Sequence, residues 1–117
     1  MLQLRPEQME AFENYMRQRF EKKMLAHLRR TFPTRLADTT DDQLRQLISE
    51  GIQHAESHDI TLEDDVRRFL EAAVILGPDF HTQAAWAAEI LRDDALDATE
   101  KMNRIEAHDA YKAARQP

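Results

Sequence analysis

Residues 40–55 read TDDQLRQLISEGIQHA, a stretch that carries both a helix start and an apolar stripe several turns long. Thr40 and Gln43 have the spacing of a capping box, in which the hydroxyl accepts an N–H that the first helical turn leaves unpaired. The apolar side chains recur three and four residues apart, the period of one helix face: Leu44, Leu47, Ile48, Ile52 and Ala55. The stretch therefore predicts an amphipathic helix. Gly51 lies at the edge of the stripe and indicates close packing against a neighbour.

A second stripe of the same kind follows directly. We expect Thr61 to cap this helix, with Asp64 at its third position, and Gly77-Pro78 to end it, because glycine and proline in that order stop helices. Its expected buried face consists of Val66, Phe69, Leu70, Ala73 and Val74.

The C-terminal third has shorter patterns. Residues 79–82 are expected to form a connector, and residues 83–91 a short helix with Trp86 turned inward. Asp97, with Glu100 three residues on, predicts the cap of a last helix that runs through Met102 and Ile105. Beyond it the apolar stripe is lost, so we expect residues 110–117 to fray, as we do residues 1–5.

A long helix is predicted over residues 6–32, because Pro6 suits a first helical position and Pro33 stops the pattern. Its large apolar residues recur every four positions: Phe12, Met16, Phe20, Met24, Leu28 and Phe32. Since a turn takes 3.6 residues, each step drifts by about 40° around the axis. The two halves of the stripe therefore face directions roughly 140° apart.

One small core cannot easily bury both halves of this stripe. We assign the more aliphatic second half to the core: Met24, Leu25, Leu28 and Phe32. From the first half we predict that Phe12, Tyr15 and Met16 contact a partner protein, because aromatic residues and methionine are enriched at interfaces. The alternative is that the other helices wrap the whole length of the first one.

Composition agrees with a helical fold. A chain of 117 residues is the size of one domain, and it has only two glycines and four prolines for turns. The sequence thus predicts an all-α protein: one domain over residues 1–117, a bundle of about five helices with a long N-terminal helix. The chain has no cysteine, no apolar run like a signal peptide and no stretch of membrane-spanning length, so we expect a cytoplasmic protein without membrane contact.

The net charge of −6 is unevenly distributed. Residues 1–37 contain eight Lys or Arg and four Asp or Glu, whereas residues 38–117 contain eight Lys or Arg and eighteen Asp or Glu. Most of the chain would repel phosphate, so we expect no nucleic-acid partner. An acidic face is typical of a solvated surface and also suits a basic protein partner.

His54 and His58 are spaced by four residues, as the first two ligands of a helical zinc site are. Glu56, however, is not directly after the first histidine, where a metalloprotease base would stand. Third ligands are available in Asp59, His81 and His108, at distances that spacing does not give. We interpret the pair as solvated histidines at a helix end and predict no metal site.

Other catalytic patterns are weak as well. The acidic pairs 41–42, 64–65 and 93–94 fall at expected helix starts or loops, where carboxylates serve as caps. Ser49 and Ser57 lack the strand–turn–helix setting of a hydrolase nucleophile, and no glycine-rich loop could hold a phosphate. We therefore predict a non-enzyme with no catalytic or cofactor-binding residues, no cofactor and no small-molecule ligand. A metal-dependent hydrolase built on His54 and His58 is the contrasting hypothesis.

Three stretches resemble a family of small helical bacterial proteins of unassigned chemistry: residues 47–52 (LISEGI), 60–69 (ITLEDDVRRF) and 76–80 (LGPDF). Residues 88–91 (AEIL) and 101–102 (KM) extend the similarity, which covers about residues 44–104. The chain departs from the family at His58-Asp59, where an aromatic residue and glycine are expected, and at His81, where an acid is usual.

Members of this family are often encoded beside type VI secretion spike tips and toxic effectors. The resemblance implies an accessory protein that binds another protein, namely an adaptor or chaperone that helps to load an effector onto the secretion apparatus. An immunity protein that neutralises a cognate toxin is the alternative, since it has a similar genetic setting and size.

Overall fold

A computed structural model describes residues 5–116, and over this range the chain is helical with no β-strand. The all-α prediction is therefore confirmed. The described residues form seven helices instead of the five expected: α1 (Pro6–Thr31), α2 (Asp41–Ser57), α3 (Glu63–Leu76), α4 (Phe80–Gln83), α5 (Ala85–Leu91), α6 (Ala98–Ala107) and α7 (Asp109–Arg115).

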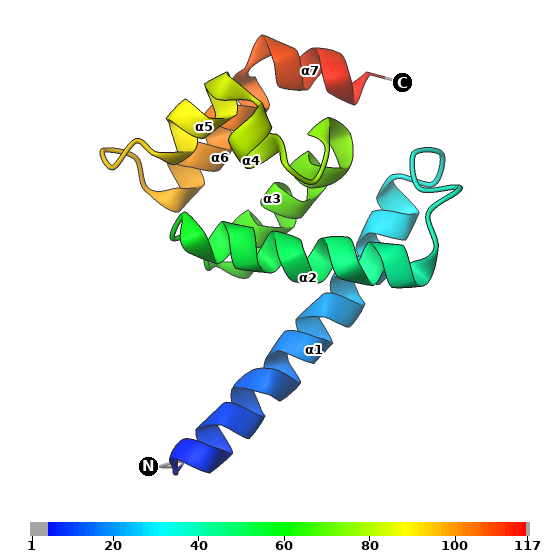
Figure 1. The fold of residues 1–117 in the computed structure, drawn as a ribbon, viewed down its shortest axis with the longest axis vertical. Helices are drawn as coiled ribbons and strands as arrows, with labels where there is room; N and C mark the ends of the chain where they lie inside the picture. The colour runs from blue at the N-terminus through cyan, green and yellow to red at the C-terminus, as the bar shows by residue number, and fades with distance from the viewer. Residues whose placement is uncertain (1–4, 117) are drawn as a thin grey trace.

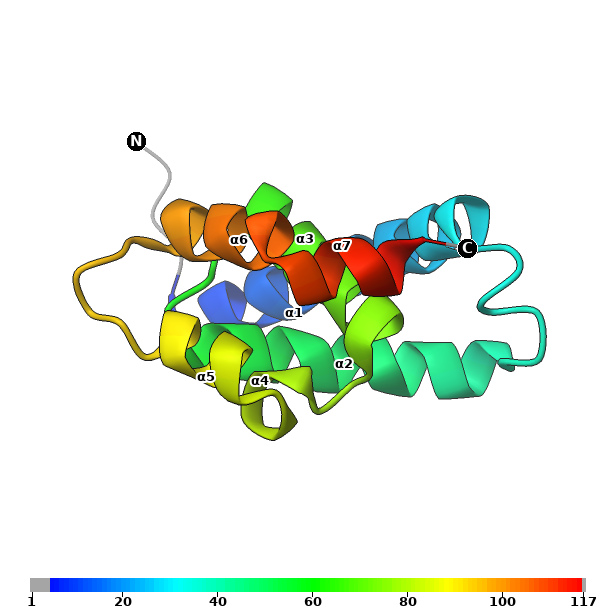
Figure 2. The ribbon, with the colours of Figure 1, turned by 90° about the horizontal axis from the view of Figure 1, so that it is seen from above.

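Helix α3 lies at the centre of the bundle, in contact with α1, α2, α4, α6 and α7. Figure 2 shows α6 and α7 along one side of the molecule and α2, α4 and α5 along the other. The central position of α3 agrees with its composition, because its buried residues lie on more than one face: Val66, Phe69, Leu70, Ala72, Ala73 and Ile75.

Helix α1 is a straight rod of 26 residues, about 39 Å long, of which only the C-terminal part crosses the bundle. The N-terminal part projects away from the other helices, as Figure 1 shows in blue. The projection makes the molecule larger than its length predicts: the radius of gyration is 15.3 Å, against about 13 Å for a compact chain of this size.

The core confirms the assignment of the second half of α1. Met24, Leu28 and Phe32 are buried, and Leu25 is half-buried against the core. The predicted face of α2 is buried at Leu44, Ile48, Ile52 and Ala55, whereas Leu47 is half-buried. Thr40 caps α2 as expected: its hydroxyl accepts the N–H of Gln43 at 3.1 Å.

Two glycines perform the roles that their positions indicate. Gly51 is buried where α2 meets α3, and a Cβ at this position would overlap the side chain of Leu70. Gly77 ends α3 with a φ of 110°, in the region that favours glycine. The chain thereby turns sharply, and Phe80 packs its ring against Phe69 at a centroid distance of 4.9 Å.

Three expected boundaries are wrong. Leu62, not Thr61, is the N-cap of α3, because the N–H of Val66 already pairs with the Leu62 carbonyl at 2.9 Å. Residues 80–83 form α4 instead of a connector, and α5 begins at Ala85 instead of residue 83.

The C-terminal segment is helical instead of frayed. After α6, the chain bends at His108 and continues as α7, which buries Tyr111 to an exposure of 2%. Arg35 also donates a hydrogen bond to the carbonyl of Ala114. At the other end, Arg5 is the N-cap of α1, and its N–H pairs with Gln8 Oε1 at 3.1 Å. The remaining predictions of fraying, at residues 1–4 and at Pro117, lie outside the described residues.

Candidate functional site: the exposed half of helix α1

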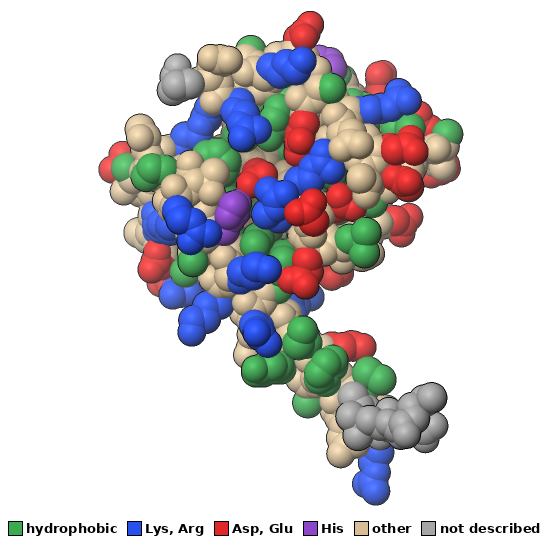
Figure 3. All heavy atoms as spheres, turned by 180° about the vertical axis from the view of Figure 1, so that it is seen from behind, with side chains coloured by type: hydrophobic (Ala, Val, Ile, Leu, Met, Phe, Trp, Pro, Cys, Tyr) green, Lys and Arg blue, Asp and Glu red, His purple; other side chains and the backbone are tan. Residues whose placement is uncertain are grey.

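The projecting part of α1 carries a row of exposed apolar side chains, which we call the α1 patch. Its members and their exposed fractions are Met9 at 43%, Phe12 at 52%, Tyr15 at 60% and Met16 at 41%. Figure 3 shows apolar side chains gathered on this projecting stem. The structure thus places the three residues predicted to contact a partner, Phe12, Tyr15 and Met16, together on a surface that the described residues leave uncovered.

The drifting stripe explains why the patch is exposed. Phe20 is half-buried at the point where α1 enters the bundle, and Met24 and Leu28 beyond it are buried. Because each four-residue step turns the stripe by about 40°, the direction that faces the bundle at Leu28 no longer does so at Phe12. The helix is also longer than the bundle is wide, so its first turns project away from the other described helices (Figure 1).

A groove continues from the α1 patch towards the bundle. Met16 and Phe20 form one wall, and Ile52, Ile60 and Val66 form the other, around a volume of about 800 Å³. Charged side chains surround this apolar lining: Glu13, Arg17, Arg19, Lys23, Glu56 and Glu63. Since Met16 belongs to both, the patch and the groove form one continuous surface that an apolar partner segment could cover.

Charge is divided along the stem. Residues 6–14 contain Glu7, Glu10 and Glu13 and no base, whereas residues 15–23 contain four bases and Glu21. Glu21 is paired with Arg17 at 3.4 Å. Lys and Arg side chains also surround the base of the stem in Figure 3. The patch is therefore acidic towards its tip and basic where it joins the bundle.

Three of the five histidines, His54, His58 and His81, lie close together on the side of the bundle formed by α2 and α4. His54 on α2 and His81 on α4 have ring centroids 4.1 Å apart, and those of His58 and His81 are 5.8 Å apart. The candidate ligand atoms of His54, Asp79 and His81 all lie within 4.8 Å of one another. We call His54, His58, Asp79 and His81 together the histidine cluster. The expected pair of His54 and His58 is thus joined by His81, which is among the third ligands that the sequence offers, and by Asp79, which is not.

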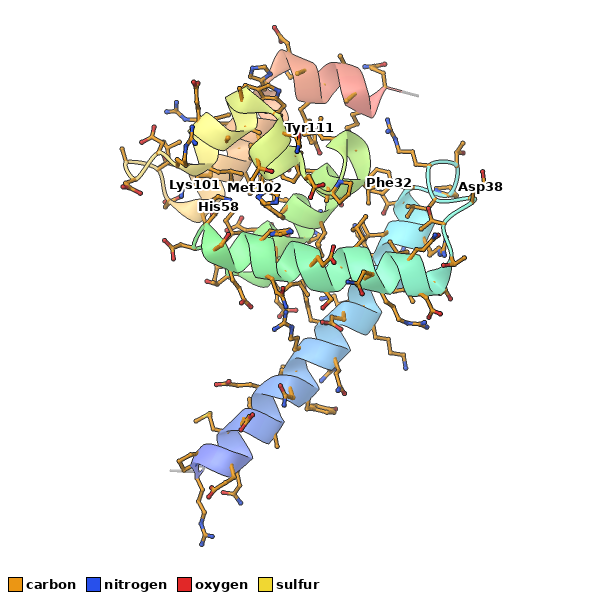
Figure 4. All side chains as sticks on the ribbon, viewed as in Figure 1. Phe32, Asp38, His58, Lys101, Met102 and Tyr111 are labelled. Atoms are coloured by element: carbon orange, nitrogen blue, oxygen red, sulfur yellow. The ribbon has the colours of Figure 1, made fainter. Side chains whose placement is uncertain are left out.

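The surroundings favour the neutral form of two of these imidazoles, because they lower the pKa of His58 and of His81. Burial lowers the pKa of His81, and His54 lowers it further, against a smaller effect of Asp79. Burial is also the main reason why the pKa of His58 is lowered, followed by His81, Lys101 and His54. Figure 4 shows His58 and Lys101 close together at the end of α2, where the Lys101 ammonium donates to the His58 carbonyl at 3.4 Å.

The other two proposed third ligands lie apart from this three-residue set. His108 stacks on Trp86 with ring centroids 4.0 Å apart, and its Nδ1 accepts the N–H of Ala110 at 3.1 Å. Asp59 follows His58, and its negative charge partly opposes the lowering of the pKa of that histidine. Trp86, expected to be core, is half-buried under His108.

Buried charges elsewhere join helices to one another. Arg68 on α3 donates to Glu106 Oε2 at 2.8 Å and to Asn103 Oδ1 at 2.6 Å on α6, and to Asp65 Oδ1 at 3.5 Å. The hydrogen bond to Glu106, helped by the charges of Glu106 and Asp65, raises the pKa of Arg68 against the opposing effect of burial. Asp65 accepts the Thr99 hydroxyl at 2.8 Å with its other oxygen. The network links α6 to α3, and each of its charged groups is paired with a group of opposite charge.

The remaining acidic pairs occupy helix starts and a loop, as expected. Asp41 lies in the first turn of α2 and pairs with Arg29 at 2.8 Å. Asp64 lies in the first turn of α3, where its hydrogen bond to Arg67 lowers its pKa. Asp93 accepts the N–H of Ala95 at 3.0 Å in the loop between α5 and α6. Local backbone and ion-pair roles thus account for these carboxylates.

Comparison with protein-family models, with curated proteins and with solved structures finds no match to this chain. None of the described helices combines the length and the apolar character that crossing a membrane requires.

Proposed function

We propose that this protein is a non-enzymatic binding module that captures another protein with the α1 patch. The supporting observation is the exposure of four large apolar side chains along one projecting helix. If each of the four side chains has a surface of about 200 Å² and exposes roughly half of it, the exposed area of the patch is about 400 Å². Patches of this size on a monomer are often functional.

The spacing of the patch favours a helix-in-groove mode of binding. Met9, Phe12 and Met16 stand at i, i+3 and i+7, the anchor positions of an amphipathic helix that lies in an apolar groove of its partner. Tyr15 adds an aromatic ring with a polar end beside this row. The groove behind Met16 and Phe20 would receive a side chain or short segment of the partner in return.

The resemblance to effector-associated bacterial proteins favours a particular partner, a type VI secretion effector or a spike component. The protein would then act in the cytoplasm as an adaptor or chaperone that holds the effector for loading. The acidic part of the chain, residues 38–117, would speed the encounter with a basic partner.

The test is direct binding to the purified products of neighbouring genes. Titration calorimetry should give one complex whose affinity falls at least about fivefold in Phe12→Ala and in Tyr15→Ala, a loss of about 1 kcal/mol or more. Gln18→Ala is the matched control, because Gln18 is exposed on the same stretch of α1 but points about 160° away from Met16. If Phe12→Ala and Tyr15→Ala bound the partner as tightly as Gln18→Ala does, the α1 patch would be excluded as the binding surface.

Toxin activity separates the two roles that the resemblance implies. An adaptor should leave a bound effector active, because it contacts a transport or packing region. An immunity protein should abolish the activity in a stoichiometric complex, and Phe12→Ala should then restore part of it.

A further inference from the structure

The five histidines of the chain differ in what their rings do. His27 pairs with Glu71 at 2.7 Å, and His108 caps α7 and stacks on Trp86. By contrast, the ring nitrogens of His54, His58 and His81 make no hydrogen bond within residues 5–116. Three imidazoles are therefore gathered in one place with their nitrogen atoms unused by the fold.

From this cluster we infer that His54, Asp79 and His81 form a binding site for a divalent first-row transition metal ion of the Zn²⁺ type. The inference is independent of the proposed function, since it concerns α2 and α4 and not the α1 patch.

The donor set has the composition that such an ion needs. Two imidazoles and one carboxylate are a common three-ligand set for zinc and for non-haem iron, and imidazole favours these ions over Mg²⁺ or Ca²⁺. The carboxylate supplies one negative charge next to two ligands that bind in their neutral form. The site would leave a fourth position for water or for a further group.

The distances are close to those of a bound site. The candidate atoms of the three residues lie within 4.8 Å of one another, and tetrahedral ligands at bond lengths of about 2.1 Å are about 3.4 Å apart. Contraction by about 1.4 Å is within reach of side-chain rotation, since Asp79 is exposed and His54 is half-exposed.

The backbone around the cluster is firmly placed. His54 stands two residues after buried Ile52 on the long helix α2, and His81 directly follows Phe80, which packs in the core against Phe69. The turn at Gly77 brings Asp79 back beside α2. The ring centroids of His58 and His81 are 5.8 Å apart, and His58 is not one of the three proposed ligands. A bound ion would thus link α4 to α2 without any change in the core.

The test uses the full chain, freed of metal by chelation and dialysis and carrying no histidine tag. Titration with Co²⁺, followed by its visible absorption, should show one bound ion per chain, and Zn²⁺ should displace it. At a hundredfold excess of free Zn²⁺ over its Kd, the Tm should rise by about 10 °C.

Variants identify the ligands. His54→Ala and Asp79→Ala should each weaken binding by about a hundredfold, while their metal-free Tm stays near that of the parent, because neither side chain is part of the core. The control is His108→Asn, which removes another imidazole but keeps a side chain able to cap α7, and it should bind as the parent does.

Three results would overturn the inference. The first is a parent that takes up no Co²⁺, and the second is binding that survives both His54→Ala and Asp79→Ala. The third is an equal loss of affinity in His108→Asn, which would indicate scattered binding to surface histidines.

Discussion

Truncation of Leu28 and of Phe12 to alanine should have opposite consequences, although both belong to the same apolar stripe of α1. Leu28 is fully buried where α1 crosses the bundle, whereas about half of Phe12 is exposed on the projecting stem. We expect Leu28→Ala to destabilise the protein strongly and Phe12→Ala to leave its stability nearly unchanged.

The magnitudes follow from the two environments. Removing a fully buried leucine side chain costs about 2–5 kcal/mol, part of it for the cavity that remains. For a domain of this size, a loss of about 3 kcal/mol lowers the Tm by roughly 12 °C. At position 12 little burial is lost, and the higher helix propensity of alanine offsets part of it, so the change should be within about 0.5 kcal/mol.

Urea unfolding, followed by circular dichroism at about 222 nm, where helices have a minimum, measures the free energy of unfolding of both variants and of the parent. The midpoint should fall clearly for Leu28→Ala only, with an unchanged slope. If Phe12→Ala destabilised the free protein as much as Leu28→Ala, the stem would be covered in solution and the α1 patch would not be a free surface. Repeating the melts over a range of protein concentrations shows whether a second copy covers it.

Three further changes test the bundle itself. Arg68→Ala should cost about 3 kcal/mol or more in urea unfolding, because it leaves buried Asp65 without its charged partner; a loss below 1 kcal/mol would contradict this. Gly51→Ala should destabilise by about 1–3 kcal/mol through overlap with Leu70, despite the better helix propensity of alanine, and a gain in Tm would show that Leu70 can move aside. Tyr111→Ala should release α7, seen as rapid amide exchange over residues 109–115, while α2 keeps its protection.

The sequence predicts the long helices well because their signals are local. The capping box at Thr40, the stop at Gly77 and the stripes of α1, α2 and α3 each lie within one segment. The exposure of Phe12 is foreseeable for the same reason, since it follows from the number of residues per turn.

The short helices depend on tertiary contacts instead. Helix α4 has four residues, and in α7 only Tyr111 and Ala114 pack against the core, so neither helix carries an apolar stripe that repeats. A single large anchor holds each of them, Phe80 for α4 and Tyr111 for α7. The histidine cluster depends on tertiary contacts in a similar way. Spacing offers His81 as a ligand but gives no distance and does not indicate Asp79. These two residues stand 27 and 25 positions from His54, and the turn at Gly77 brings them together.

The projecting stem also has a consequence for helix nucleation. An isolated peptide with the sequence of the stem would be mostly unfolded, because starting a helix is unfavourable by a factor of about 10⁻³, or about 4 kcal/mol. In the intact chain the buried half of α1 at Met24 and Leu28 supplies the nucleus, and each turn towards the tip only extends it. We therefore expect the helix to fray from Pro6 inward and its amide protection to rise towards the bundle. A partner that binds the tip therefore does not have to supply the free energy of helix nucleation, because the buried half of α1 has already supplied it.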